Sequence, residues 1–165
     1  MKKLVSLLML LLPMAVSAQN FGRVDIQAVM ESMPEYIKAG GELQALSKQY
    51  ENELTAMQDE IQRKNDEYEK NKSTMNATMQ QETEATITEM IQKYQQAYQD
   101  NQQALQKAQQ EKLQPLYEKV TQAIESVGKS GNYVFIVQTN TMLYTSETLT
   151  TDVTDAVKAE INKLK

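Results

Sequence analysis

The feature that most constrains this fold is a long stretch almost free of helix breakers, from Glu35 to Val127. Its apolar residues recur mostly at steps of three and four, the spacing that places them on one face of a helix. A first stripe comprises Leu43, Leu46, Tyr50, Leu54, Met57, Ile61 and Tyr68, and a second comprises Ile87, Met90, Tyr94, Tyr98, Leu105, Ala108, Leu113, Leu116, Val120, Ile124 and Val127. Ser, Thr and Asn between the stripes lower helix propensity. We therefore predict a long antiparallel coiled-coil hairpin over 35–127, with its tip at about 71–80.

Two features are expected to disturb these helices. Gly40-Gly41 interrupts the pattern early, so residues 35–39 are predicted to form a separate turn or a flexible joint. Pro115 removes one backbone donor from the second helix, which predicts a kink. The apolar stripes are thin and the segment from Gln92 to Gln110 is rich in Gln, which favours a bendable hairpin.

The segments that flank the hairpin predict a small β-sheet body. Residues 21–30 alternate loosely, as in a half-buried strand, and Tyr133–Gln138 is an apolar run suited to a buried strand. A turn at Thr139-Asn140 predicts a hairpin with a further strand at Met142–Tyr144. Asp152 is predicted to cap a final helix whose inner side chains are Val153, Val157, Ile161 and Leu164. The predicted class is thus α+β and mostly helical, with the hairpin inserted between a first strand in 19–34 and the remaining strands and helix in 128–165.

The N-terminus has the pattern of a secretory signal peptide. Lys2 and Lys3 precede an apolar run from Leu4 to Val16, and small residues lead up to Ala18. The run is shorter than the ~20 residues needed to span a bilayer. We therefore predict a signal peptide over 1–18, cleavage after Ala18 and a periplasmic location.

The composition excludes several classes of function. The chain has no Cys and no His, which rules out His-based triads, Cys nucleophiles and His-based zinc sites. Removing Lys2 and Lys3 takes the formal charge from −5 to −7, which argues against nucleic acid as a partner. With two Phe and no Trp, a compact monomeric core would be poor, so association with other copies is expected.

Two patterns that resemble functional motifs have simpler explanations. Gly128-Lys129-Ser130 looks like the end of a phosphate-binding loop, but position 123 is Ala, and a helix precedes it where the motif needs a strand. Asp59-Glu60 and Asp66-Glu67 are read as solvated helix charges rather than metal ligands. The sequence thus indicates no enzyme and no cofactor.

The methionines near the predicted tip are the best candidates for contacts with a partner. Met57, Met75, Met79 and Met90 lie in or near the distal half of the hairpin, and ordinary packing explains most of them. Flexible, polarisable Met side chains recur on surfaces that bind many partners. Met75 and Met79, where the apolar stripes end, are predicted client-contact residues.

The two ends of the mature chain resemble the Skp/OmpH family of periplasmic chaperones. The matching stretches are Phe21–Met30 with Pro34-Glu35, Tyr133–Tyr144 and Thr151–Val157. The resemblance implies a homotrimer of jellyfish-like architecture, with a small β body from which helical arms extend around a cavity. In the body it places Val24, Ile26, Val134, Ile136 and Leu143.

The resemblance also implies the activity of an ATP-independent holdase. Unfolded outer-membrane proteins would be held between the arms and kept from aggregating. The best-known members are basic, whereas this mature chain is acidic, so no basic lipopolysaccharide site is carried over and lipid contact stays open. The alternative is a structural coiled-coil protein of the envelope that bridges other components.

Overall fold

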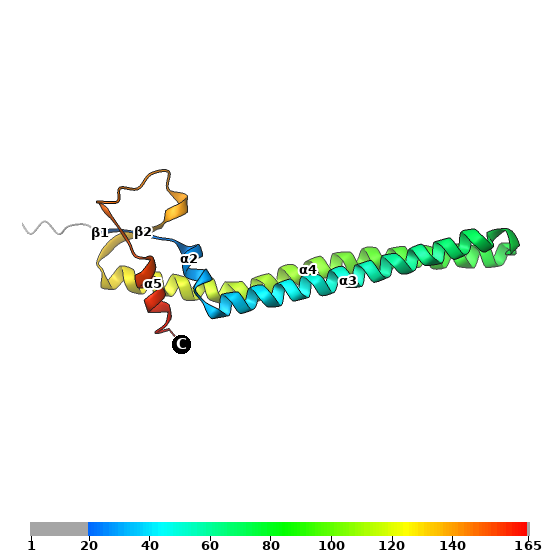
Figure 1. Ribbon diagram of the computed structural model, residues 1–165, viewed down its shortest axis with the longest axis horizontal. Coiled ribbons are helices and arrows are strands. Elements are labelled where there is room, and N and C mark those ends of the chain that lie inside the picture. The colour runs from blue at the N-terminus through cyan, green and yellow to red at the C-terminus, as the bar shows by residue number, and fades with distance from the viewer. Residues whose placement is uncertain (1–19, 165) are drawn as a thin grey trace, which may run out of the picture. The chain divides into compact units, whose positions relative to one another are not determined.

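The computed structural model describes residues 20–164, so the predicted signal peptide lies outside the described residues (Figure 1). The chain divides into two units. We call residues 20–26 and 122–164 the sheet unit, and residues 27–121 the hairpin unit. The short helix α2 (Ile26–Glu31) and the long helix α4 (Ala77–Ser130) each contain residues of both.

The sheet unit contains a three-stranded parallel sheet in the order β2-β1-β3. Its strands are β1 (Asn20–Val24), β2 (Tyr133–Gln138) and β3 (Thr150–Asp152). In register, Gly22 lies opposite Ile136 of β2 and Thr151 of β3. Parallel strands need a long crossover between them, and here the whole helical hairpin is the connection from β1 to β2.

A glycine lets β1 approach β2 closely. A Cβ atom on Gly22 would lie 2.8 Å from Cγ1 of Ile136 and 3.2 Å from the Tyr133 ring. Next to it, the rings of Phe21 and Phe135 pack with their centroids 4.8 Å apart. The glycine is therefore required by packing rather than by its backbone angles.

The end of α4 sets up the start of β2. Gly131 N donates to the Val127 carbonyl at 2.9 Å, and Asn132 adopts a left-handed φ of 50°. Asn is one of the few residues that tolerates this conformation. Helix α4 ends at Ser130, and the turn into β2 comprises Gly131 and Asn132.

The sheet unit has a small apolar core. Its buried side chains are Val24, Ala123, Val127, Val153, Val157 and Ile161. Helix α5 (Thr154–Ile161) contributes the last two of these, and Ser126 of α4 donates to the Glu160 carboxylate at 2.7 Å. The N-cap residue of α5 is Val153, which makes no side-chain capping hydrogen bond, so the predicted cap at Asp152 is wrong by one residue. The Asp152 carboxylate still accepts a hydrogen bond from the Thr154 amide at 3.0 Å. The hydroxyl and amide of Thr154 lower the pKa of Asp152.

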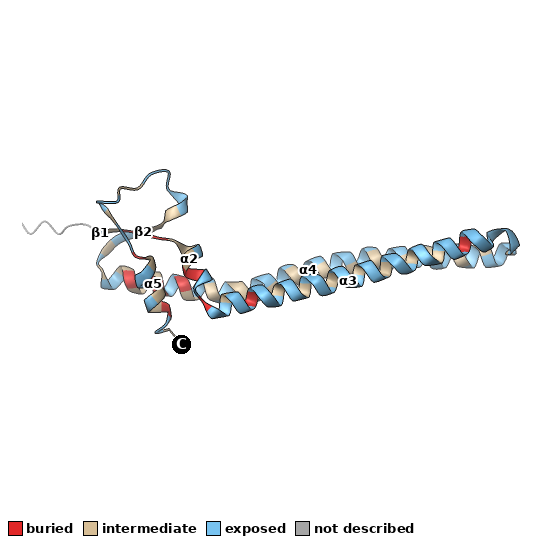
Figure 2. Ribbon diagram, in the orientation of Figure 1, coloured by how far each residue is buried: buried red, intermediate tan, exposed pale blue. Residues whose placement is uncertain are grey.

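The hairpin unit consists of α3 (Pro34–Asn71) and most of α4, running antiparallel. The turn between them is a 3-10 segment at Lys72–Thr74, within the range predicted for the tip. Figure 2 shows that much of the hairpin is exposed or half-buried along its length. In this unit the buried apolar side chains are few: Val29, Met30, Met33, Ala39, Tyr68 and Val120.

Three predictions about the elements were wrong. Residues 26–30 are helical, so the first strand ends at Val24. Met142–Tyr144 is not a strand and no antiparallel hairpin follows β2; the third strand is Thr150–Asp152. β-Propensity needs a neighbouring strand and a surface to pack on, and residues 142–144 are exposed instead. The last helix ends at Ile161, short of Leu164.

The predicted break at Gly40-Gly41 is also wrong, because α3 is continuous through both glycines. A glycine inside a helix costs about 1 kcal/mol relative to alanine. That cost is small beside the cooperative gain of a long helix that packs along its partner. Pro115 likewise lies inside α4 without ending it.

Candidate interaction surfaces

The predicted body residues do not form one cluster. Val24 is buried at 2% exposure, Ile26 and Ile136 are half-buried, and Val134 is 57% exposed. Leu143 is fully exposed, with no packing partner in the single chain. Val24 and Ile136 belong to paired strands, Ile26 starts α2, and Leu143 lies in the connection between β2 and β3. Their predicted role in a trimer is not tested by this arrangement.

Val134 and Leu143 belong to a larger set of exposed apolar side chains that lie near one another in the sequence. The set consists of Val134, Phe135, Met142, Leu143, Tyr144 and Leu149. Among them, only Val134 and Leu143 are predicted from the sequence to belong to the trimer body. A signal was present, since Val134-Phe135 and Met142–Tyr144 are consecutive apolar residues, and one face of a sheet cannot bury consecutive side chains.

Ion pairs join α3 to α4 in the half of the hairpin that contains Pro34. Lys119 lies 3.2 Å from Glu35, and Lys112 donates to Glu42. The pKa of Glu42 is lowered by the hydrogen bond from Lys112 and then by its charge. That of Glu35 is lowered first by a backbone hydrogen bond and then by Lys119. These pairs favour one register of the two helices.

A single buried tyrosine joins the helices near the tip. Tyr68 is 4% exposed and donates its hydroxyl hydrogen to Glu84 of α4. Lys72 lies over its ring, with Nζ 5.0 Å from the centroid. The sequence pattern predicts Tyr68 in the apolar stripe but indicates no role for its hydroxyl.

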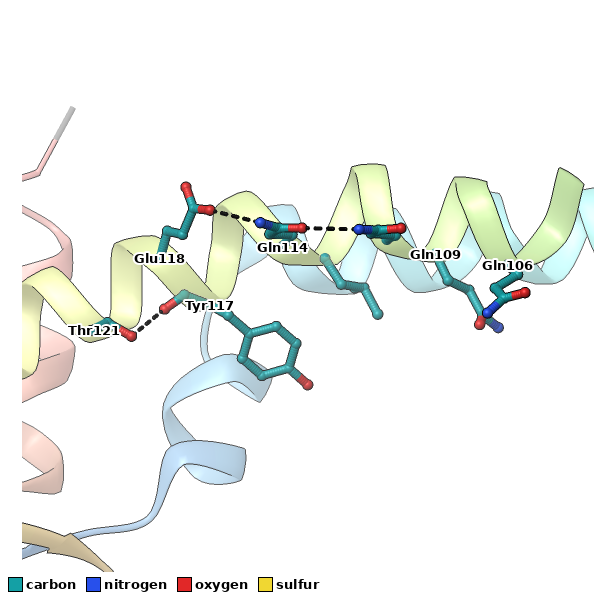
Figure 3. A pocket seen from close by; sticks show the side chains of 8 residues that line it. Gln106, Gln109, Gln114, Tyr117, Glu118 and Thr121 are labelled. Carbon is teal, nitrogen blue, oxygen red and sulfur yellow. Dashed lines mark hydrogen bonds between the residues drawn. The ribbon is translucent and has the colours of Figure 1, made fainter. Parts of the chain in front are cut away.

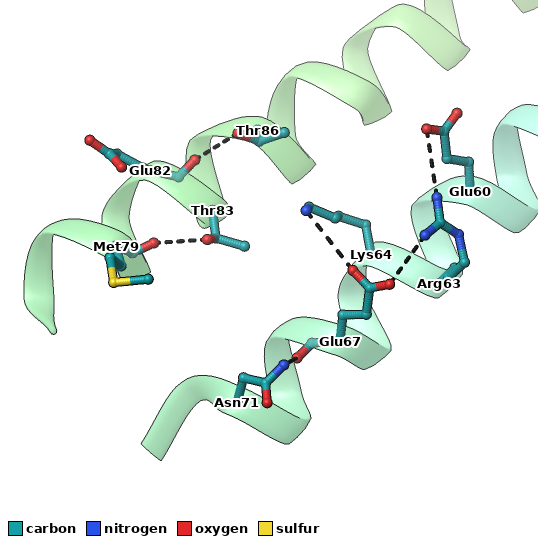
Figure 4. A network of polar contacts seen from close by, with 9 residues as sticks. All are labelled: Glu60, Arg63, Lys64, Glu67, Asn71, Met79, Glu82, Thr83 and Thr86. Carbon is teal, nitrogen blue, oxygen red and sulfur yellow. Dashed lines mark hydrogen bonds and ion pairs between the residues drawn. The ribbon is translucent and has the colours of Figure 1, made fainter. Parts of the chain in front are cut away.

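The tip itself is hydrogen-bonded and polar. Asn76 accepts from the Met79 amide at 2.9 Å, and the Gln80 side chain donates to the carbonyls of Lys72 and Met75. Beside it, Arg63 and Lys64 pair with Glu67 on the surface of α3 (Figure 4). Exposed pairs of this kind contribute at most about 1 kcal/mol each.

The two predicted client-contact residues differ in exposure. Met75 is half-buried in the turn, whereas Met79 is 48% exposed in the first turn of α4. The tip therefore offers one exposed Met, and its predicted role in client contact stays a prediction.

A groove on α4 was not found by sequence analysis. It has a volume of about 550 Å³ and is lined by α4 alone (Figure 3). Its lining is Gln106, Gln109, Gln110, Leu113, Gln114, Tyr117, Glu118 and Thr121. The signal in the sequence was a helical face rich in Gln that also carries Leu113, from the second apolar stripe, and Tyr117, which lies off that stripe.

The described residues contain no group of three or more acidic, His or Cys side chains placed to hold a metal ion. In the same part of the chain, no helix is long and apolar enough to cross a membrane. The surfaces described above are apolar or amide-rich, which suits binding of other polypeptides.

The chain matches a known protein family by sequence and a solved structure by fold. A model of the OmpH-like outer membrane protein family matches residues 20–161. The fold is similar to a candidate outer membrane chaperone (OmpH-like) from Caulobacter crescentus, with a TM-score of 0.75 and 16% identity. That match covers 89% of this chain and 86% of the other. No curated protein sequence matches the chain.

Proposed function

Because the chain belongs to the OmpH-like outer membrane protein family, we propose that it is an ATP-independent holdase of the periplasm. It binds unfolded outer-membrane β-barrel proteins and prevents their aggregation before they insert. The observation that carries this proposal is the family match, which runs from β1 to α5 and so spans both units. The similar fold of the Caulobacter crescentus protein, itself described as a candidate chaperone, supports it.

The chaperone acts as a homotrimer assembled through the sheet unit. Large apolar side chains that stay exposed in a single copy favour an interaction site, and Leu143, Tyr144 and Leu149 are each at least 73% exposed in the single chain. The edge strands β2 and β3 offer unpaired backbone groups to another copy. Three hairpins around a cavity then hold the client.

Client binding relies on many weak contacts along the hairpins. The hairpin unit buries few large side chains, and its exposed apolar residues include Ile37, Met79, Ile91, Tyr98 and Tyr117. Weak contacts hold an unfolded client without imposing one conformation, and they release it once a better-packed state is available. No ATP is needed for such a cycle.

The first test measures assembly and holding together. The mature protein, starting after Ala18, is examined by light scattering alone and with an outer-membrane β-barrel protein diluted from urea. The expected result is three times the monomer mass, uptake of the client and loss of turbidity at equimolar trimer. A protein that leaves client aggregation unchanged would overturn the holdase. A monomer or dimer that suppresses it would overturn only the trimer.

A further inference from the structure

The middle of the hairpin unit contains a half-open cavity between its two helices. The cavity has a volume of about 230 Å³. Its lining is Ser47, Tyr50, Glu51 and Leu54 of α3, and Asn101, Gln102 and Leu105 of α4. Side chains that border a gap have no partner atoms on one side and lose those contacts. The two helices are therefore packed less well here than a filled contact would allow.

The cavity region contains a buried polar atom without a partner. Nδ2 of Asn101 is buried, and among the described residues none accepts a hydrogen bond from it. A buried amide that stays unpaired costs free energy, and this cost disappears when water reaches the group. The closed arrangement of the helices at Asn101 is therefore less favourable than it would be with an apolar side chain.

The side chains around Asn101 add little apolar packing. Between residues 95 and 104 of α4, the half-buried side chains are Ala97, Asn101 and Ala104. All three are short. On α3, the buried side chains are Ala39 and Tyr68, so none lies in the middle of that helix. The apolar contact between the helices is thus weakest around the cavity.

Polar links between the helices lie on either side of this region. Towards Pro34, Lys112 of α4 pairs with Glu42 of α3. Towards the tip, Tyr68 donates to Glu84. Between these two links, no side-chain hydrogen bond or ion pair of the described residues joins α3 to α4. The helices are held together on both sides of Asn101 and only weakly beside it.

A buried Asn between two helices has a second known role, which is to fix their register. That role requires a polar group on the facing helix to receive the amide. Since the buried Nδ2 of Asn101 has no acceptor among the described residues, this role is not favoured. The ion pairs at Glu35 and Glu42 and the Tyr68–Glu84 hydrogen bond already favour one register.

We propose that the hairpin has an opening point at Asn101. There α3 and α4 separate locally, water reaches the Asn101 amide, and the distal half of the hairpin bends while the links on either side hold. The inference goes beyond the proposed holdase function and does not depend on it, because every group that carries it belongs to a single hairpin.

Backbone amide hydrogen exchange of the mature protein, followed by mass spectrometry, tests the opening point. Residues 47–57 and 97–105 are expected to exchange about tenfold faster than residues 35–46 and 108–120. Asn101→Leu removes the unpaired amide and fills part of the cavity. It is expected to slow exchange in the middle of the hairpin about tenfold. Asn101→Ala removes the amide but leaves the cavity, and its effect is expected to be smaller.

Asn52→Leu is the matched control. Asn52 lies on α3 next to Glu51, but it is exposed and does not line the cavity. The change gives the same gain in helix propensity as Asn101→Leu and is expected to slow exchange less than about threefold. Equal slowing in Asn52→Leu and Asn101→Leu would overturn the proposal. A wild-type protein whose middle exchanges no faster than residues 35–46 would overturn it as well.

Circular dichroism checks that each variant keeps its helix content. If Asn101→Leu loses helix, the wild-type exchange pattern and the Asn101→Ala variant decide the proposal. Uniform exchange along the hairpin in a protein that suppresses client aggregation would remove the opening point and leave the holdase. Fast exchange in the middle of a protein that does not suppress aggregation would do the reverse.

Discussion

Tyr68 of α3 donates its hydroxyl hydrogen to the carboxylate of Glu84 on α4, and its side chain is 4% exposed. The hydrogen bond to Glu84 raises the pKa of Tyr68 to about 12, so the phenol remains a donor throughout the neutral range. Among the residues that the structure describes, no other side-chain hydrogen bond or ion pair joins α3 to α4 in the distal half of the hairpin. The pair therefore fixes their register near the tip.

Replacing Tyr68 by Phe keeps the buried ring but removes the hydrogen bond. The Glu84 carboxylate then loses its donor, and the distal hairpin opens more often. We expect faster amide hydrogen exchange over residues 65–90 and little change in the sheet unit. Tyr98→Phe, on the exposed surface of α4, is the control. Equal exchange in Tyr68→Phe and wild type would show that the hydrogen bond does not hold the tip.

The ion pairs of Glu35 and Glu42 predict a loss of stability in acid. Both pKa values are lowered in the folded chain from 4.5, so their contribution is complete above about pH 4.5 and disappears as the pH falls through the folded values. Thermal unfolding at about pH 6 and about pH 3 should show a smaller acid-induced fall in Tm for Glu42→Gln than for wild type. The variant Glu53→Gln, changed on the exposed face of the same helix, should show the same acid-induced fall in Tm as the wild type. An identical fall in all three proteins would contradict the role of these pairs.

Two glycines should respond to alanine in opposite directions. At Gly22 the added Cβ meets Ile136 at 2.8 Å, and overpacking of this kind costs roughly 1–3 kcal/mol. At Gly41 nothing lies within 4 Å, and alanine in a continuous helix gains about 1 kcal/mol. Urea unfolding should therefore give a lower midpoint for Gly22→Ala and a higher one for Gly41→Ala. A lower midpoint for Gly41→Ala would indicate that the glycines serve a joint, as the sequence alone suggested.

The hairpin was predictable because its signal is repeated over many turns. Apolar residues recur from Leu43 to Tyr68, mostly at spacings of three and four, and a polar segment follows them. Both features depend on local side-chain chemistry, which can be read directly from a sequence. The helix-breaking effect of Gly40-Gly41 was overestimated, because the cooperativity of a long helix outweighs two unfavourable residues. The paired Lys and Glu residues across the hairpin were missed, because their contact depends on the register of two distant segments.

The sheet was harder to predict because its pairing joins the ends of the chain. Residues 142–144 form an apolar run, yet the third strand is Thr150–Asp152, held by pairing with β1 and by the Arg23–Asp152 contact at 3.7 Å. β-Propensity alone cannot decide which of two segments pairs with the edge of a sheet.

The exposed residues between β2 and β3 give the sharpest test of assembly. Leu143 is fully exposed in the single chain, so a charge at this position would disturb no packing contact there. If it is buried between copies, Leu143→Asp leaves a carboxylate without hydration or partner, at a cost of several kcal/mol per site. We expect normal helix content but a monomer by light scattering. Ile37→Asp, 66% exposed in the hairpin unit, should keep the wild-type mass. A Leu143→Asp protein that still forms trimers would place the interface elsewhere on the sheet unit, with Val134-Phe135 as the next pair to change.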